Sequence, residues 1–433
     1  MTNRMVGRAV LALAMFLTMP LFPAAARADE LNSWWTGENM TGDWGGLRDK
    51  LEDMGIEIEV EYTAEMAGNP VGGLGQGFRY AHELDFGGSV DLGKLAGIEG
   101  MTFTVGFAEY AGNSLSKAEI GNLFSVQEIY VSTPDVRLAE LSLQQSLFDD
   151  HLNLKAGWID AGSDFAVLPL ACNFWNEAFC DNPASLGENS GFTEAPNSSW
   201  GGRIRVGFGD FYAQTGAYEV NPRLARQYHG FDLGTSGATG AFIPFEVGWN
   251  PVDALFGLPG QFRVGGYYDT SNVDDVTAEI DEDSPPGKHH GRWGIYVLGQ
   301  QKVYREPGNA ARGLTVFGGF VYGDSQTAEI QWFAEAGLVY QGTFPGRDDD
   351  TINLGFAYGH INGNLISAQK NANKDDPGSE VVQSAEAVVE LNYGAQVTPW
   401  WLLSPGMQVI INPGADNGIP TALVLGLKTA LAF

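Results

Sequence analysis

The chain has 433 residues, with 53 Asp and Glu against 24 Lys and Arg, which gives a formal net charge of -29. This excess of negative charge argues against nucleic acid as a partner, because phosphate binding needs clustered positive charge. Glycine is abundant at 58 residues, whereas the hydrophobic fraction of 44% is ordinary. Composition alone therefore does not indicate a membrane protein.

The N-terminus has the layout of a secretory signal peptide. Arg4 and Arg8 form a short positive region, residues 9–22 are mostly apolar, and residues 26–28 read Ala-Arg-Ala, a small-x-small cleavage site. The apolar part is too short for a typical membrane-spanning helix. We therefore expect residues 1–28 to be removed on export, with an uncleaved membrane anchor as the alternative.

The two cysteines of the chain, Cys172 and Cys180, lie in a segment rich in Asn, Pro and aromatic residues. In an exported protein such a pair usually closes a local disulfide. A reduced or metal-bound pair is the alternative, although no third ligand lies nearby in the sequence. We expect a disulfide between them.

Beyond the signal peptide the residue pattern is mainly that of strands. A short amphipathic helix is expected around residues 47–54, where apolar residues recur at helical spacing. From Ile56 onward apolar and polar residues alternate. In the last strand we expect Lys428 to face inward and an apolar set to face outward, namely Leu423, Leu425, Leu427, Leu431 and Phe433. No later segment approaches the roughly 18 apolar residues of a transmembrane helix.

Alternation alone does not distinguish a membrane barrel from a soluble β-sandwich, because both bury one apolar face. Three features favour the membrane barrel: long strand candidates, aromatic residues such as Tyr130, Trp400 and Trp401 near strand ends, and polar faces that carry charges and small residues. We therefore predict an all-β fold, a transmembrane antiparallel β-barrel of about 16 strands.

The barrel is expected to span residues 56–433, preceded by a short N-terminal periplasmic segment with a helix, residues 29–55. Four long connections are rich in Asp, Asn, Gly and Pro, and we expect them to be extracellular loops. They lie at residues 163–199, 221–243, 271–290 and 364–380.

Several short motifs carry a resemblance to a known family. They are residues 41–48 (TGDWGGLR), 154–160 (LKAGWID), 172–174 (CNF), 397–401 (VTPWW) and 410–414 (IINPG), with a terminal Phe433. Together they resemble the carbohydrate-selective porins of the OprB family, over nearly all of the chain after the signal peptide. The resemblance implies a 16-stranded barrel in the bacterial outer membrane, with a narrow, sugar-preferring channel that inward loops constrict.

Strand parity, rather than the family, supplies the candidate pore-lining residues. The inward-facing charges are Arg79, Glu83, Glu128, Lys155, Arg203, Arg205 and Glu335. Mixed basic and acidic side chains can hydrogen-bond sugar hydroxyls, and basic residues in the channel would oppose the passage of cations. The alternative for each residue is that it braces the barrel wall in a salt bridge.

Two aromatic residues in the cysteine-bearing segment, Phe174 and Trp175, are candidates for stacking on the C–H face of a sugar. That role requires the segment to fold into the path of the solute. The alternative is that both rings pack the segment against the barrel or belong to the outer aromatic belt.

Motifs for catalysis and for metal or cofactor binding are poor. The histidines are scattered, no Gly-x-Ser-x-Gly elbow is present, and the glycine-rich residues 71–77 lack the Lys-Ser/Thr of a phosphate loop. His289 and His290 follow the acidic residues 281–283, but a solvated loop explains them better than a metal site. We expect no catalytic residue, metal or cofactor.

The sequence therefore predicts a passive outer-membrane porin that prefers small sugars and contacts outer-membrane lipid, as a monomer or a homotrimer. A general or cation-preferring diffusion porin is the main alternative. A barrel-based enzyme and a structural barrel with a plugged lumen remain further alternatives, and the sequence does not indicate which sugar is preferred.

Overall fold

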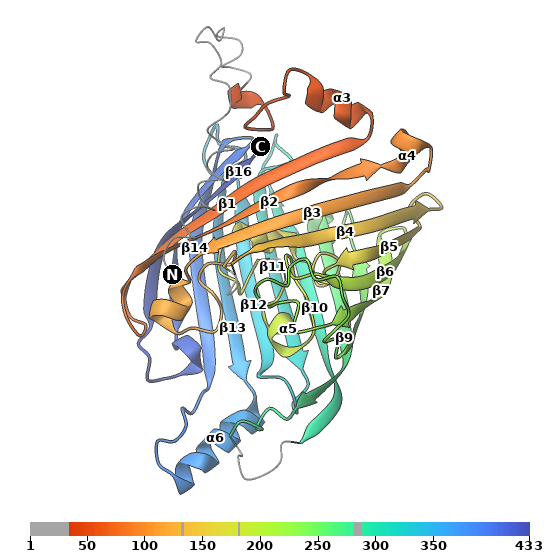
Figure 1. The fold of residues 1–433 in the computed structure, drawn as a ribbon. Helices are drawn as coiled ribbons and strands as arrows, with labels where there is room; N and C mark the ends of the chain where they lie inside the picture. Colours follow the sequence, from red (N-terminus) through yellow and green to blue (C-terminus); the bar gives the residue numbers. More distant parts are fainter. Residues whose placement is uncertain (1–33, 131–133, 181, 281–286) are drawn as a thin grey trace, which may run out of the picture.

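The computed structural model describes residues 34–130, 134–180, 182–280 and 287–433. These residues form one closed barrel of sixteen antiparallel strands, in which each strand pairs with the next along the chain and β16 closes on β1 (Figure 1). The predicted all-β barrel of about 16 strands is confirmed. The expected signal peptide, residues 1–28, lies outside the described residues and stays a prediction.

The strands are β1 (Ile56–Val71), β2 (Phe78–Asp91), β3 (Met101–Gly112), β4 (Val136–Leu147), β5 (Leu152–Ile159), β6 (Ser199–Phe208), β7 (Phe211–Val220), β8 (Gly240–Trp249), β9 (Gly260–Asp274), β10 (Lys288–Arg305), β11 (Gly313–Gly323), β12 (Ile330–Gln341), β13 (Thr351–Ile361), β14 (Ala385–Thr398), β15 (Trp401–Ile411) and β16 (Ala422–Ala432). The helices include α3 (Leu47–Asp53), α4 (Leu92–Ala96), α5 (Ser185–Asn189), α6 (Gly363–Asp375) and a π-helical turn, η1 (Ser116–Ile120). None of the helices in the described residues is long and apolar enough to cross a membrane.

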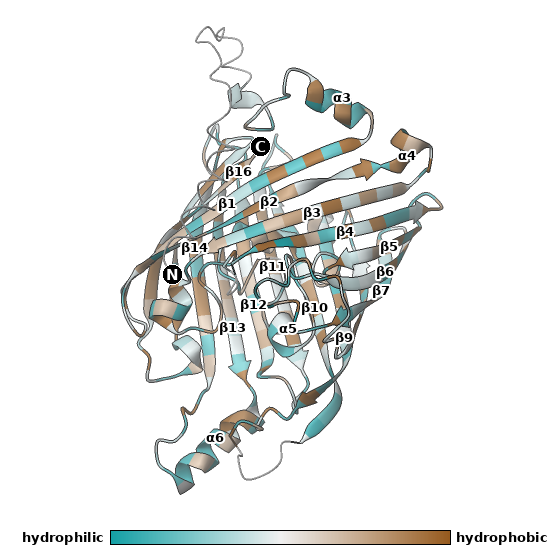
Figure 2. Ribbon diagram, viewed as in Figure 1, coloured by the Kyte–Doolittle hydropathy of each residue, from teal (hydrophilic) through white to brown (hydrophobic). Residues whose placement is uncertain are grey.

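The alternation of apolar and polar residues sorts side chains between the two faces of the barrel. On β8, Ile243, Phe245 and Val247 are exposed on the outside, whereas the intervening Glu246 is buried inside. On β16 the outward Leu425 is 52% exposed, and Lys428 points inward to Glu128. The register expected for the last strand is therefore confirmed. Figure 2 shows the same alternation as hydrophobic and hydrophilic bands along β1 and β2.

Aromatic side chains form a row near each end of the outer face. Beside the turns after β6 and β8, Phe208, Phe211, Trp249 and Phe262 stack in sequence, with ring centroids 5.4–5.9 Å apart. Near the opposite end, Phe320, Trp332 and Tyr358 form a second row with centroids 5.0–6.2 Å apart. A barrel in a lipid bilayer needs an apolar outer face with a row of aromatic residues at each membrane interface, and this barrel has such a face.

The two ends of the barrel carry different connections. Short turns, such as residues 209–210 and 399–400, lie at the end that holds α3 and the C-terminus, whereas α6 and the longer connections lie at the other end (Figure 1). Long connections occur where the sequence predicted them, at 160–198, 221–239, 275–287 and 362–384, and also at 113–135. The last of these was not predicted, because strand parity assigned Glu128 to the barrel wall.

Two of the long connections fold back into the barrel. Loop A (residues 113–135) leaves the barrel between β3 and β4, and loop B (residues 160–198) leaves it between β5 and β6. Phe124 of loop A nevertheless contacts Phe333 of β12, and Phe174 of loop B contacts Phe317 of β11, with ring centroids 5.4 and 5.6 Å apart. Both loops therefore cross the interior to the far wall, where their apolar side chains join one buried cluster.

The segment before β1 is bound to the last residues of the chain. The backbone N–H of Met40 donates to the carbonyl of Ala432 at 2.8 Å, and the guanidinium of Arg48 donates to the carbonyl of Phe433 at 2.7 Å. The indole N–H of Trp400 donates to the carbonyl of Trp34 at 3.0 Å. These contacts fix the N-terminal segment, including the predicted helix α3, against the seam where β16 meets β1.

Candidate functional site

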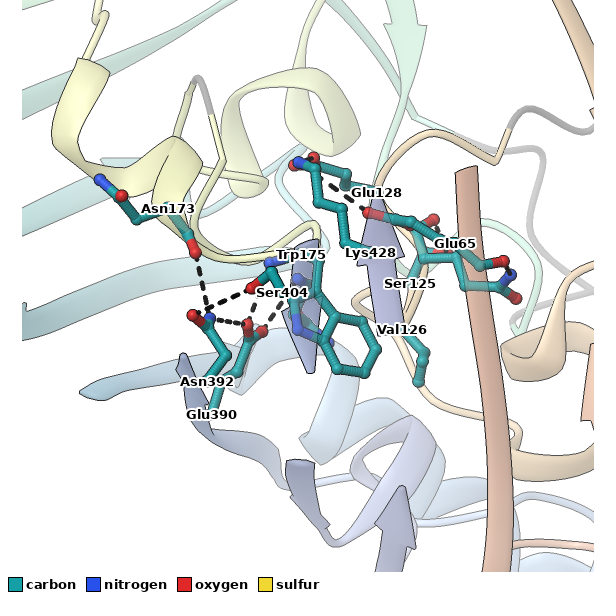
Figure 3. Close-up of polar contacts among 12 residues, drawn as sticks. Glu65, Ser125, Val126, Glu128, Asn173, Trp175, Glu390, Asn392, Ser404 and Lys428 are labelled. Carbon is teal, nitrogen blue, oxygen red and sulfur yellow. Dashed lines mark hydrogen bonds and ion pairs between the residues drawn. The ribbon is translucent and has the colours of Figure 1, made fainter. Parts of the chain in front are cut away.

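Buried carboxylates on the barrel wall accept the backbone N–H groups of both inward loops. Glu390 on β14 accepts from the N–H of Trp175 and of Asn176, both at 3.0 Å, and also from the side chain of Gln408 at 3.2 Å (Figure 3). Its relative exposure is 0%. A loop without regular structure leaves its amides unpaired, and a buried unpaired amide is costly. Glu390 satisfies two of them.

The same arrangement recurs at three other points of the wall. Glu386 on β14 accepts from the N–H of Leu123 at 2.7 Å and of Phe124 at 3.1 Å, which holds loop A. Two further carboxylates hold loop B: Glu246 accepts from the N–H of Ala166, and Asp269 accepts from the N–H of Gly191, both at 2.9 Å. Glu246, Asp269, Glu386 and Glu390 are called the anchor carboxylates below.

Sequence reasoning did not single out the anchor carboxylates, because they look like any other acidic residue on a polar strand face. A weak signal exists: Glu246 lies directly opposite Gln214, and Glu390 directly opposite Gln408, in the strand register. Each Gln side chain donates to its Glu, at 3.0 and 3.2 Å. A Gln directly opposite a Glu on the inward face of adjacent strands is therefore consistent with a Glu carboxylate that is held in one position.

Loops A and B are also joined to each other. The N–H of Glu128 donates to the carbonyl of Trp175 at 3.2 Å, and the N–H of Glu177 donates to the carbonyl of Ser125 at 3.0 Å. In return, the Glu177 carboxylate accepts from the N–H of Ser125 at 2.6 Å. Lys428 on β16 pairs with Glu128 and lies 4.0 Å from Glu65, so it ties loop A to the wall (Figure 3).

Two loop carboxyls have a pKa well above the ordinary range. Burial raises the pKa of Glu177 from its ordinary value of 4.5 to about 7, and nearby Glu188 and Glu128 add to the shift, while the Ser125 N–H and Lys117 oppose it. Burial likewise raises the pKa of Asp160 to about 6, although Ser163 donates two hydrogen bonds to its carboxylate. Both groups therefore change charge in the range near neutrality.

Most of the predicted basic pore residues are held in ion pairs. Arg79 pairs with Glu119 of loop A, and Lys155 pairs with Glu140 at 3.1 Å. Arg203 contacts Asp164 of loop B at 3.0 Å. These partners come from neighbouring strands and from the inward loops, so the three side chains brace the wall and the loops. This is the alternative that the sequence left open.

The remaining charged candidates fall into different environments. Arg205 stacks on the ring of Tyr212, with its guanidinium carbon 3.8 Å from the ring centroid. Glu335 on β12 is 4% exposed, and neither of its carboxylate oxygens has a hydrogen-bond partner among the described residues. Glu128 lies in loop A rather than on a strand, so its assignment by strand parity was wrong. It nevertheless faces the interior.

The two aromatic candidates have no ring face open to a solute. Phe174 and Trp175 are each 0% exposed. The Trp175 indole lies against Gly406 of β15 and Gly426 of β16, where any side chain would collide with it. Stacking on a sugar therefore does not fit this conformation, and the packing alternative does. Nearby Cys172 and Cys180 are half-buried in the same loop, and their disulfide stays a prediction.

Two cavities remain in the interior beside the loops. The first, of about 480 Å³, lies among loops A and B and the strand ends near the long connections. Its charged lining residues are Glu83, Glu128, Glu177, Glu188, Glu194, Glu219 and Arg292. Arg79, Lys155, Arg203, Arg205 and Glu335 do not line it, so only Glu83 and Glu128 of the predicted charged set do.

The second cavity, of about 500 Å³, lies nearer the end that holds α3 and the C-terminus. Its charged lining residues are Glu59, Glu61, Asp85, Glu140 and Asp160. Ala195 of loop B lines both cavities, so loop B separates them. Within the part of the chain that the structure describes, no group of three or more His, Cys, Asp or Glu is placed to hold a metal ion. Residues 281–283 lie outside that part.

A closed barrel with an apolar outer face, two aromatic rows and a polar interior narrowed by loops is an outer-membrane porin. Comparison with known proteins specifies the family. The model of the family described as carbohydrate-selective porin, OprB family, matches residues 75–433. The chain belongs to this family of the bacterial outer membrane.

Individual relatives extend the likeness over nearly the whole chain. The chain is 35% identical to Porin B of Pseudomonas aeruginosa, over 94% of this chain and 93% of that protein. It is 30% identical to the Putative porin QuiX of Acinetobacter baylyi, over 96% of this chain and 99% of that protein. The high-pH structure of Pseudomonas putida OprB is similar with a TM-score of 0.88 and 33% identity, covering 92% of this chain and 99% of the other.

The anchor role of Glu390 can be tested by Glu390→Leu, which removes both acceptors and leaves the N–H groups of Trp175 and Asn176 buried and unpaired. Each such group costs about 1–3 kcal/mol, so we expect a lower urea midpoint for the barrel in lipid vesicles and faster proteolysis within loop B. Glu59→Leu is the matched control, since Glu59 lines a cavity. Equal midpoints for the parent and Glu390→Leu would contradict the anchor role.

The raised pKa of Glu177 predicts a pH dependence of stability. The folded state holds this proton more tightly than the unfolded chain, so the stabilisation is present below about pH 4.5 and is lost as the pH rises through about 7. We expect the free energy of unfolding to fall from pH 5 to pH 8, and the fall to be smaller in Glu177→Gln. Glu52→Gln, on exposed α3, is the control. The prediction fails if Glu177→Gln and the control show the same pH slope.

Proposed function

We propose that the chain forms a passive channel through which small sugars diffuse across the outer membrane. The observation that carries the proposal is the pair of cavities, each lined in part by carboxylate, hydroxyl and amide side chains, that loop B separates inside the barrel. A solute crossing the barrel by this route passes Ala195, which lines both cavities. A narrow passage of this kind favours small solutes over large ones.

The chemistry of the cavities suits hydroxyl-rich solutes. A sugar hydroxyl both donates and accepts hydrogen bonds. The first cavity offers Asn197, Ser198, Ser199 and Asn221, which can do either, and its glutamates accept. Because Ser199 begins β6, Asn221 directly follows β7, and Asn197 and Ser198 end the anchored loop B, a sugar meets positioned partners at little cost in reorganisation. Carbohydrate preference then follows from complementary hydrogen bonding.

Three alternatives make different predictions. A general diffusion porin passes amino acids as readily as sugars of similar size. A barrel plugged by loops A and B passes neither. A barrel-based enzyme needs a catalytic group, whereas the family membership supports a channel. The monomeric or homotrimeric state stays a prediction.

Solute uptake into proteoliposomes distinguishes these alternatives. We expect labelled glucose and other monosaccharides to enter faster than disaccharides, and faster than neutral amino acids of similar size. Vesicles that contain heat-denatured protein provide the background rate. Uptake of every solute at the background rate would contradict the proposal and favour a plugged barrel, and equal rates for sugars and amino acids would favour a general diffusion porin.

A further inference from the structure

We propose that the channel also selects by charge, admitting neutral and amine-bearing sugars and rejecting sugars that carry a carboxylate or a phosphate. This inference rests on the proposed sugar channel and specifies the class of sugar that it accepts. It follows from how the charged residues of the interior divide between the cavities and the wall.

The first observation is the imbalance of charge along the path of the solute. Six glutamates and one arginine line the first cavity, and five acidic residues with no basic residue line the second, among the residues that the structure describes. A solute that crosses both cavities therefore passes carboxylates at each stage, on the wall strands as well as on loops A and B.

The second observation is that the basic residues of the interior are committed to other partners. Arg292, the basic residue that lines the first cavity, pairs with the fully buried anchor carboxylate Asp269 at 2.8 Å. Lys155 pairs with Glu140 and Arg203 with Asp164, and neither base lines a cavity. Two of the lining carboxylates are neutralised by such pairs, Glu140 by Lys155 and Glu128 by Lys428. No such pair offsets Glu59, Glu61 or Asp85 in the described residues.

The third observation is a stripe of like charge on β1 and β2. Glu61 and Asp85 are directly opposite each other in the register, and Glu59 lies two residues along β1 on the same face. All three line the second cavity, and no ion pair joins them to a basic side chain in the described residues. Like charges directly opposite destabilise a sheet, so barrel stability does not account for this stripe.

These charges act differently on the three classes of sugar. Low-dielectric walls concentrate the field of a charged lining in a narrow channel, so an anion is repelled and a cation is attracted. A neutral sugar donates its hydroxyls to the carboxylates and feels no net force. An ammonium group donates hydrogen bonds to the same acceptors and gains the attraction as well. The stripe is therefore a specificity determinant against anionic sugars.

The test uses three solutes with the same ring: glucose, glucosamine and glucuronate. Their uptake is measured into proteoliposomes at pH 7 and low salt, with the membrane potential held at zero. We expect glucosamine to enter at least as fast as glucose, and glucuronate to enter about ten-fold more slowly. In 1 M salt the Debye length shrinks to about 3 Å, and the three rates should converge.

A triple variant, Glu59→Gln with Glu61→Gln and Asp85→Asn, removes the stripe while keeping side-chain size. We expect the ratio of glucosamine to glucuronate uptake to fall at least about three-fold, because three charges leave the second cavity. The matched control, Asp49→Asn with Glu52→Gln and Asp53→Asn, removes the same charge at exposed positions of α3. The ratio of glucosamine to glucuronate uptake in the control variant should equal that of the parent protein.

The outcomes separate this inference from the function on which it rests. If glucuronate enters the parent vesicles as fast as glucose, charge selection is wrong while the sugar channel stands. Heat-modifiable migration in gel electrophoresis shows whether the triple variant folds. If the folded variant keeps the parental ratio of glucosamine to glucuronate uptake, the stripe does not determine charge selection. If no sugar enters at all, the proposed channel itself is wrong.

Discussion

The structure depends on one interaction, the hydrogen bond from a loop backbone N–H to a buried carboxylate on the barrel wall. A closed barrel satisfies the backbone groups of its own strands, but a loop that enters the barrel brings unpaired N–H groups with it. Glu246, Asp269, Glu386 and Glu390 accept those groups at 2.7–3.1 Å. A buried N–H group that finds an acceptor avoids the cost of an unpaired group, so a few carboxyl groups can hold two long loops.

The excess of acidic residues therefore has two uses in this barrel. One set is buried and holds loops A and B, which determine where the channel narrows. The other set, which includes Glu59, Glu61 and Asp85, faces the cavities and acts on the solute. The basic residues belong to the wall, since Arg203 and Lys155 pair with Asp164 and Glu140. Glu140 also lines the second cavity, so the acidic residues on the path without a basic partner in the described residues include Glu59, Glu61 and Asp85.

Period-two alternation was sufficient to predict the barrel, the face of Leu425 and the inward direction of Lys428, because a register error of one residue would reverse every side chain. The same rule failed at Glu128, where a short alternating segment belongs to loop A. It also placed Arg79 and Arg203 in the interior without showing that Glu119 and Asp164 neutralise them. Those partners lie on loops, whose paths depend on the tertiary structure. The burial of Trp175 likewise depends on Gly406 and Gly426, on strands remote in sequence.

Hydrogen exchange of the folded barrel in lipid nanodiscs tests the central claim most directly. The loop amides that are bonded to anchor carboxylates should exchange as slowly as amides within the strands. These amides are those of Leu123, Phe124, Ala166, Trp175, Asn176 and Gly191. Amides of exposed turns, such as Gly308 and Gly346, serve as the fast reference. Exchange of the six loop amides at that fast rate would contradict the account, because loops A and B would then not be held inside the barrel.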